Sequence, residues 1–188
     1  MKKAEALEFA ILGTLHDGPA HGYELRKRLN QVLGTFHAIS FGSLYPALKA
    51  LGARGEVTET ADDSSSRRRI VYAITELGSQ RFQAQLANVG PDAWEDDTFG
   101  LHFAFFSRFN AEDRASILEG RRMRLAERRA LMRESLARTR EQIDAYMLEL
   151  HRHGLEGMDR ELRWLEGLID AEQQKKQSPN NPTSPDVA

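Results

Sequence analysis

The sequence predicts a mainly α-helical protein in which one small β-hairpin interrupts the helices and a long-helix region follows. Three observations support this fold class. Apolar residues recur at helical spacing through most of the 188 residues, and residues 70–74 show the alternation of a β-strand. Charged residues make up 29% and hydrophobic residues 40% of the chain, as is typical of a helical protein that can bury a core.

Composition and motifs exclude several classes of function. The chain has no cysteine, so it forms no disulfide, thiolate metal site or cysteine nucleophile. Its six histidines are scattered, and it has no phosphate-binding glycine loop, nucleophile elbow or paired-carboxylate motif. We therefore expect no enzyme activity, no metal and no cofactor. No apolar run is long enough to span a membrane, so we expect a soluble, cytoplasmic protein with no membrane partner.

Turn residues delimit the first two helices. Apolar spacing predicts a helix over residues 4–15. Asp17-Gly18-Pro19 ends it, because proline is tolerated in the first turn of the next helix but not inside this one. The second helix is expected to run to about Leu33, where Gly34 can form a left-handed C-terminal cap.

A short third helix over residues 40–51 carries the strongest functional signal. Its inner face is apolar, because leucines recur at i, i+4 and i+7, namely Leu44, Leu48 and Leu51. Its first turn and flank carry side chains that suit DNA base edges or phosphates, namely Ser40, Ser43, Tyr45 and Lys49. Pro46 has no N–H to donate to the Gly42 carbonyl. We therefore expect the helix either to begin near Ser43 or to be kinked early.

A β-hairpin and a fourth helix are expected next. Residues 56–60 and 70–74 are predicted to form its strands, and the polar segment 61–69 joins them. This segment concentrates positive charge in three consecutive residues, namely Arg67, Arg68 and Arg69. We expect them to contact phosphates or a minor groove, with a solvated loop as the alternative. Thr75 is a suitable N-cap for a helix that ends at Gly90-Pro91.

Three helices, a hairpin and a fourth helix follow one another in the order of a winged helix-turn-helix domain, which we place at residues 1–90. This region has 11 Lys and Arg against 9 Asp and Glu, although the whole chain has a net charge of −2. At the start of the second helix, His21 and Tyr23 are placed to contact the DNA backbone. Packing of Tyr23 beneath the hairpin is the alternative.

An aromatic cluster follows residue 91. Phe99, Phe103 and Phe106 recur at i, i+4 and i+7, and Trp94 precedes them. Aromatic residues at this spacing most often form a core. The alternative is an effector pocket at a dimer interface, lined by these four residues and suited to a ligand with an apolar ring.

Asn110 can cap a long helix that is predicted to continue to about Arg152. Apolar residues form two rows with a seven-residue repeat, namely Leu118, Leu125, Met132, Leu136, Ile143 and Leu150. A helix of about 60 Å cannot be buried in one small domain. We therefore expect these rows to form a dimer interface.

The end of the chain is expected to hold one more helix. Gly154 and Gly157 should end the long helix, and a last helix with apolar residues at helical spacing should follow. We place a helical dimerisation and effector domain at residues 91–174. Residues 175–188 are rich in Pro, Ser and Asn and are expected to be a disordered tail.

Four motifs occur in order in the first part of the chain. They are Leu12-Gly13-x-Leu15, Gly18-Pro19-x-His21-Gly22-Tyr23-Glu24-Leu25, Ser40-x-Gly42-Ser43-Leu44-Tyr45-Pro46-Ala47-Leu48 and Tyr72-x-Ile74-Thr75-Glu76-x-Gly78. Through these motifs the chain resembles the PadR family of bacterial transcriptional regulators. The resemblance implies a winged helix dimer that represses promoters and is released by a small aromatic or hydrophobic effector.

The residues and the resemblance together predict a homodimeric transcriptional repressor that binds a palindromic operator in double-stranded DNA. The alternative is a winged helix module that binds other proteins and makes no direct DNA readout. Salt-dependent binding to the DNA upstream of its own gene would separate the two functions.

Overall fold

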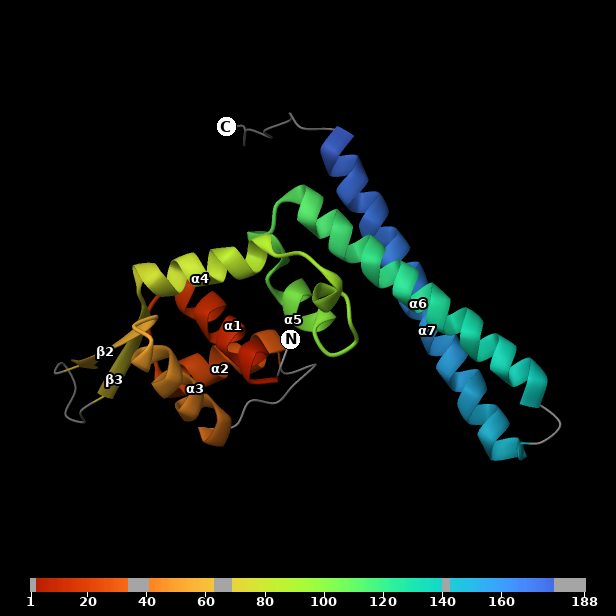
Figure 1. The fold of residues 1–188 in the computed structure, drawn as a ribbon, viewed down its shortest axis with the longest axis horizontal. Helices are drawn as coiled ribbons and strands as arrows, with labels where there is room; N and C mark the ends of the chain where they lie inside the picture. The colour runs from red at the N-terminus through yellow and green to blue at the C-terminus, as the bar shows by residue number, and fades with distance from the viewer. Residues whose placement is uncertain (1–2, 34–40, 63–68, 140–142, 178–188) are drawn as a thin grey trace, which may run out of the picture. The chain divides into compact units, whose positions relative to one another are not determined.

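A group of helices and a small antiparallel sheet at one side of them make up the first part of the chain (Figure 1). The computed structural model describes residues 3–33, 41–62, 69–139 and 143–177. The chain divides into two compact units, residues 1–109 and residues 110–188.

Three of the helices in the first unit build its core, namely α1 Lys3–His16, α2 Gly22–Leu33 and α3 Phe41–Ala53. Helix α1 contacts both other helices and is almost completely buried from Phe9 to Leu15. These bounds confirm the first and third predicted helices to within two residues, whereas α2 begins at Gly22, about three residues after the expected start at Pro19, because Ala20 and His21 form a strand. The proposed cap at Gly34 lies outside the described residues. The three leucines of α3 are fully buried, at 0–1% exposure, as their spacing predicted.

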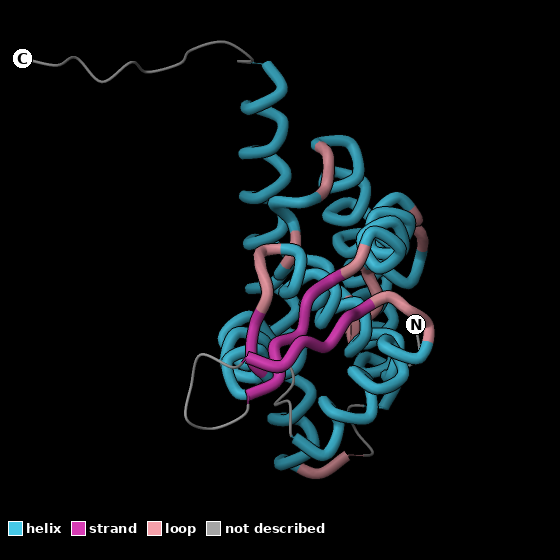
Figure 2. Tube along the Cα trace, turned by 90° about the vertical axis from the view of Figure 1, so that its left-hand side faces the viewer, coloured by secondary structure: helices cyan, strands magenta, loops and turns pink. Residues whose placement is uncertain are grey.

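The sheet consists of β1 Ala20–His21, β2 Val57–Asp62 and β3 Arg69–Ile74, with β3 in the centre. All pairings are antiparallel, and Figure 2 shows the strands side by side. The predicted hairpin is confirmed, and its strands pair from Val57↔Ile74 to Asp62↔Arg69. The two residues of β1 are too few for an alternation pattern, which explains why sequence periodicity did not reveal this strand.

Helix α4 (Glu76–Ala87) begins where the sequence predicted. The Thr75 hydroxyl accepts the Gly78 N–H at 3.1 Å and donates to the Gly55 carbonyl at 2.7 Å, so Thr75 is the N-cap. Gly78 lies against the backbone of Glu56, the residue directly before β2, because a Cβ added there would stand 2.1 Å from the Glu56 carbonyl oxygen. The start of α4 is therefore in direct backbone contact with the segment that leads into β2.

The segment from 91 to 109 folds onto the first unit as η1 Pro91–Ala93, α5 Phe99–Ala104 and η2 Phe106–Arg108. The Phe105 ring packs edge-on against Phe9 of α1 and Phe82 of α4, at centroid distances of 5.4 and 5.9 Å. The boundary between the compact units therefore falls after Phe109. The domain boundary expected at residue 90 would separate Phe105 from the core that buries it.

The second unit is an antiparallel hairpin of α6 Ala111–Thr139 and α7 Ala145–Gln177. Asn110 caps α6 as predicted, because its side-chain oxygen accepts the N–H groups of Glu112 and Asp113 at 2.9 and 2.8 Å. The prediction of one continuous helix to Arg152 was wrong. A new helix begins after Asp144, whose carboxylate accepts the Met147 N–H at 2.8 Å and acts as its N-cap.

Two further predictions for this unit were also wrong. Gly154 and Gly157 do not end a helix but lie inside α7. A Cβ added at Gly154 would lie 3.6 Å from the Met132 sulfur, so the small residue lies directly against α6. Glycine costs roughly 1 kcal/mol inside a helix relative to alanine, and α7 nevertheless continues through both positions. Helix α7 continues to Gln177, past the predicted start of the tail, and residues 178–188 lie outside the described part of the chain.

Apolar side chains and ion pairs join α6 to α7. The buried apolar residues are Ile117, Leu118, Leu125, Met158, Leu162, Leu165 and Ile169. Beside them, Arg114 contacts Glu172 at 2.7 Å, Arg121 contacts Glu161 at 2.7 Å, and Arg129 contacts Asp159 at 2.5 Å. Arginines about two turns apart along α6 thus pair with acids along α7, and these pairs help to fix the register of the hairpin.

Candidate nucleic-acid interface

Helix α3 presents the expected polar face. While its leucines are buried, Ser43, Tyr45 and Lys49 are exposed, and Tyr45 keeps 46% of its surface accessible. The helix begins at Phe41 and contains Pro46, so a start near Ser43 was wrong. Pro46 has no N–H for the Gly42 carbonyl, so this hydrogen bond is missing from the first turn of α3. Ser40 lies outside the described residues.

The N-terminus of α2 lies against Tyr45. A Cβ added at Gly22 would lie 2.9 Å from the Tyr45 hydroxyl and 3.3 Å from its ring, so only a glycine leaves room for the ring in this position. The pKa of the Tyr72 phenol on β3 is raised, chiefly by burial and to a smaller extent by the charges of Glu59 and Tyr45. Tyr45 therefore stands where α2, α3 and the sheet come together.

His21 and Tyr23 lie on either side of Gly22. Strand β1 pairs His21 with Val71 of β3, and the His21 Nδ1 lies 3.3 Å from the Ile70 carbonyl oxygen. Tyr23 is 67% exposed, so it does not pack beneath the hairpin as the alternative had it. Both predicted backbone contacts thus begin at the junction between the hairpin and α2. Arg67 and Arg68 lie outside the described residues, and Arg69 is described only as the first residue of β3.

Four charged residues hold the end of α3 and the start of β2 in place. The Glu8 carboxylate of α1 lies 2.8 Å from both Arg54 and Arg81, and the Glu56 carboxylate lies 2.9 Å from Arg54 and 2.6 Å from Arg81. Burial acts to raise the pKa of Glu8, but the hydrogen bonds from Arg81 and Arg54 outweigh it and lower this pKa below its ordinary value. Both carboxylates are buried, so this network fixes the candidate recognition helix and the hairpin to α1 and α4.

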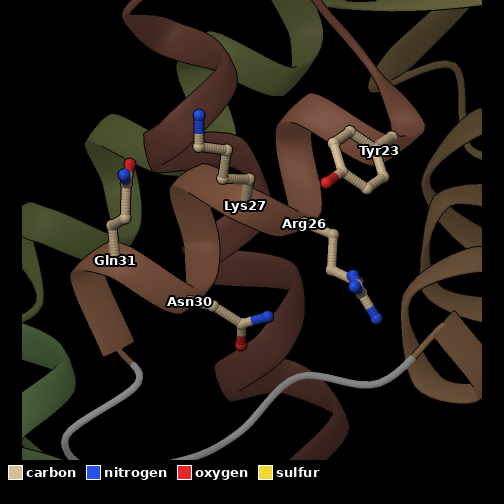
Figure 3. Close-up of a pocket in the computed structure, with 5 residues that line it drawn as sticks. All are labelled: Tyr23, Arg26, Lys27, Asn30 and Gln31. Atoms are coloured by element: carbon tan, nitrogen blue, oxygen red, sulfur yellow. The ribbon is translucent and has the colours of Figure 1, made fainter.

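One group of polar residues escaped the sequence analysis. Five side chains on the exposed side of α2 line a shallow pocket, namely Tyr23, Arg26, Lys27, Asn30 and Gln31 (Figure 3). Their spacing of three or four residues is the polar counterpart of the apolar stripe that packs α2 into the core. Counting polar as well as apolar periodicity would have revealed them.

The predicted effector residues form part of an aromatic series. Phe99 contacts Phe103 at a centroid distance of 5.8 Å, Phe103 contacts Phe106 at 4.8 Å, and Phe106 contacts Phe109 at 5.9 Å. Phe99 is buried, whereas Phe103, Phe106 and Trp94 are half-buried. This arrangement is that of an aromatic core with an accessible side, and effector binding there stays a prediction.

The predicted dimerisation residues lie in different environments. Leu118 and Leu125 are buried between α6 and α7 of one chain, and Met132, Leu136 and Ile143 are half-buried. Leu150 is 62% exposed. The break after Thr139 means that the six residues do not form one continuous seam along a single helix. Their role in dimerisation stays a prediction.

The described residues hold neither a membrane-spanning helix nor a metal-binding cluster. None of the helices there is long and apolar enough to cross a membrane. Within the same ranges, no group of three or more His, Cys, Asp or Glu side chains is placed to hold a metal ion.

Helices α2 and α3, the β2–β3 hairpin and the core helix α1 define a winged helix-turn-helix domain, which is followed by a helical C-terminal region. The family model of the transcriptional regulator PadR-like family matches residues 11–84. Residues 11–84 are thus similar to this family, which is also the family that the sequence motifs resemble.

Several known proteins are similar to this chain. The negative transcriptional regulator PadR of Bacillus subtilis (strain 168) is 27% identical over 115 residues, which cover 60% of this chain and 63% of that protein. The chain thus spans less than two thirds of the length of this relative. The crystal structure of Bacillus subtilis PadR in complex with operator DNA is 21% identical, with a TM-score of 0.44, covering 88% of this chain and 98% of the other. The complex of the same protein with p-coumaric acid is 20% identical, with a TM-score of 0.42, covering 92% of this chain and 98% of the other.

Proposed function

We propose that this protein is a transcriptional repressor that binds double-stranded DNA. The observation that carries the proposal is the two-sided character of α3. Three of its leucines are fully buried, whereas Ser43, Tyr45 and Lys49 are exposed beside the hairpin and the start of α2. An anchored helix with short polar, aromatic and basic side chains on its outer face suits the major groove. The Bacillus subtilis relative is itself a negative transcriptional regulator, which supports the direction of the effect.

We propose further that the protein acts as a homodimer through its second unit. The α6–α7 hairpin leaves large apolar side chains exposed, namely Met123, Leu131, Tyr146, Met147, Leu150 and Trp164. A second copy of the hairpin would remove such side chains from water. Two recognition helices related by a two-fold axis would enter successive major grooves about 34 Å apart, so the operator should be palindromic.

A small hydrophobic or aromatic effector is the proposed release signal. The half-buried rings of Trp94, Phe103 and Phe106 offer an apolar ligand partial burial and ring contacts. Such a ligand should quench tryptophan fluorescence, and Trp94→Phe should abolish the response while Trp164 still reports on the second unit. A response that is unchanged in Trp94→Phe would remove Trp94 from the site.

Footprinting on the DNA upstream of the gene for this chain tests the proposed function directly. The expected result is a protected inverted repeat, bound by a dimer whose mass is measured by analytical ultracentrifugation. Absence of salt-dependent binding to this DNA would overturn the proposal and favour the protein-interaction module instead.

A further inference from the structure

A very short segment connects the candidate recognition helix to the β2–β3 hairpin. Residues 54–56 alone separate the end of α3 from the start of β2, and we name them the α3–β2 joint. The Gly55 N–H donates to the Gly52 carbonyl at 2.9 Å. The Glu56 N–H donates to the Leu51 carbonyl at 3.0 Å. Because Gly55 has a φ of +71°, these two hydrogen bonds make the joint a Schellman motif, which fixes the direction in which the chain leaves a helix.

The start of α4 holds the same joint from the other side. The Thr75 hydroxyl donates to the Gly55 carbonyl at 2.7 Å, and the Thr75 N–H donates to the Glu56 carbonyl at 3.0 Å. Gly78 lies so close to the Glu56 carbonyl that no Cβ fits between them. Both of these carbonyls are therefore bonded to the N-cap of α4, and the backbone of the joint is held at several points.

The side chain of Glu56 adds a third set of contacts. Its carboxylate is only 9% exposed and lies 2.9 Å from Arg54 and 2.6 Å from Arg81 of α4. One residue thus ends α3 through its N–H, binds the cap of α4 through its carbonyl and pairs with two arginines through its side chain. Since Val57 continues directly into β2, the position of Glu56 sets the direction of the hairpin relative to α3.

We infer that Glu56 is a positioning residue for DNA recognition, because it holds the hairpin at a fixed angle to α3. The inference rests on the proposed function and deepens it. Glu56 is buried and negatively charged, so it acts through the hairpin and α3 and not by binding phosphate. Contacts to the DNA backbone set the register in which a recognition helix meets the base edges. A hairpin that is loose relative to α3 loses this register, whereas binding to unrelated DNA depends mainly on charge.

Glu8 provides a matched comparison. Its carboxylate pairs with the same two arginines, Arg54 and Arg81, at 2.8 Å each, and it is 12% exposed. Its backbone, however, belongs to α1 and not to the joint. Loss of either carboxylate leaves the two arginines with one acid, so the electrostatic effects are similar. Only a change at Glu56 acts on the connection between α3 and β2.

Discrimination between two duplexes tests the inference. Affinities for the DNA upstream of its own gene and for a duplex of unrelated sequence are measured by fluorescence anisotropy at one salt concentration. Glu56→Gln should weaken binding to the upstream DNA about tenfold. Its affinity for the unrelated duplex should stay within about twofold of the wild type. Glu8→Gln should keep the wild-type ratio of the two affinities. Circular dichroism establishes that each variant is folded under these conditions.

A second variant of the joint changes no charge. Gly55→Ala places a side chain at a positive φ, and its Cβ would have no neighbour closer than the Leu77 methyl group at 4.0 Å. The substitution therefore acts on the backbone conformation of the joint and not through a steric clash. It should reduce the ratio of the two affinities as Glu56→Gln does. If Glu56→Gln does not fold, Gly55→Ala decides the question alone.

The outcomes separate this inference from the proposed function. If the wild-type protein does not prefer the upstream DNA, the proposed function itself fails. If the wild-type protein discriminates and the folded joint variants keep its ratio, only the inference fails. An equal loss of discrimination in Glu8→Gln would assign the effect to the whole ion network and overturn the specific role of Glu56. Weakening by the same factor on both duplexes would overturn it too, because a positioning residue acts on the specific complex.

Discussion

The Arg81 guanidinium lies 2.6 Å from the Glu56 carboxylate, and this contact joins α4 to the residue directly before β2. The same guanidinium also reaches Glu8 of α1, so one side chain connects three elements around the candidate recognition helix. The side chain of Arg81 is 26% exposed, whereas those of Glu8 and Glu56 are only 12% and 9% exposed. Each carboxylate therefore depends on the two arginines for compensation of its charge.

Arg81→Gln should lower the free energy of unfolding by about 1–3 kcal/mol, because it leaves two buried carboxylates with Arg54 as their shared cation. Urea denaturation followed by circular dichroism measures the change. Arg138→Gln is the control, since Arg138 pairs with Glu134 on an exposed helix surface and both side chains are more than 60% exposed. The control should change stability by no more than about 0.5 kcal/mol. Equal losses in the two variants would contradict the role of the network.

His102 should make stability depend on pH near neutrality. Burial against Phe9 and Phe109 lowers the pKa of His102 below 6.5, although a hydrogen bond to the Thr98 carbonyl and the nearby Asp92 act in the opposite direction. The unfolded chain therefore binds a proton at a higher pH than the folded chain does. Stability is fully present above pH 6.5 and falls as the pH is lowered through this value.

The test for His102 is the urea midpoint of unfolding, measured at several pH values between about pH 8 and pH 5. This range brackets the ordinary pKa of histidine. His102→Phe keeps a ring of similar shape in the aromatic cluster and should remove much of the loss on acidification. In this variant the Thr98 carbonyl loses the imidazole but still accepts the backbone N–H of residue 102. An equally steep loss in His102→Phe would contradict the assignment. The lowered pKa of Glu8 acts in a separate, more acidic window, below its ordinary value of 4.5.

Two helical glycines should respond to alanine in opposite directions. Gly78→Ala would place its Cβ 2.1 Å from the carbonyl oxygen of Glu56, just before β2, so α4 must shift away from this residue and the protein should lose about 2 kcal/mol or more. Gly167→Ala meets no neighbouring atom within 4 Å and should gain roughly 0.5–1 kcal/mol from helix propensity. Thermal unfolding of the two variants provides the comparison. A stable Gly78→Ala protein would show that the contact between α4 and the sheet is adaptable.

Gly22→Ala should impair DNA binding more than folding. The new methyl group would lie 2.9 Å from the Tyr45 hydroxyl, which stands at the end of an exposed side chain and can move. Moving Tyr45 relieves the contact at little cost in stability but displaces a predicted DNA contact on α3. Affinity for the upstream DNA should fall about tenfold, an effect of about 1.4 kcal/mol. The control adds Gly22→Ala to a Tyr45→Phe protein, which lacks the hydroxyl. A further loss of affinity of about tenfold in that double variant, relative to Tyr45→Phe alone, would contradict the explanation.

The local signals in the sequence predicted the winged helix domain well. Leucine spacing located the buried side of α3, and Thr75 and Asn110 were correctly identified as helix caps. These features depend on residues that are close in sequence, so a local pattern is sufficient to reveal them. The ion network of Glu8, Arg54, Glu56 and Arg81 was not predicted, because its members come from four separate segments.

The second unit shows why a regular pattern can mislead. A seven-residue apolar repeat is compatible with one long helix and also with two helices that pack against each other. Asp144 was the residue that distinguished them, because it caps the second helix, and its signal was weaker than the apolar rows around it. Glycines 154 and 157 suggested a helix end, yet α7 continues through both, and Gly154 lies beside Met132 of α6.

The α6–α7 hairpin has a consequence for the order of assembly. Each chain already buries Leu118, Leu125 and Leu165 between its own two helices and fixes their register with ion pairs. We therefore expect the second unit to fold before the proposed dimer associates, and a dissociated subunit to retain its helices. The helix content measured by far-ultraviolet circular dichroism should stay constant on dilution through the dissociation of any dimer.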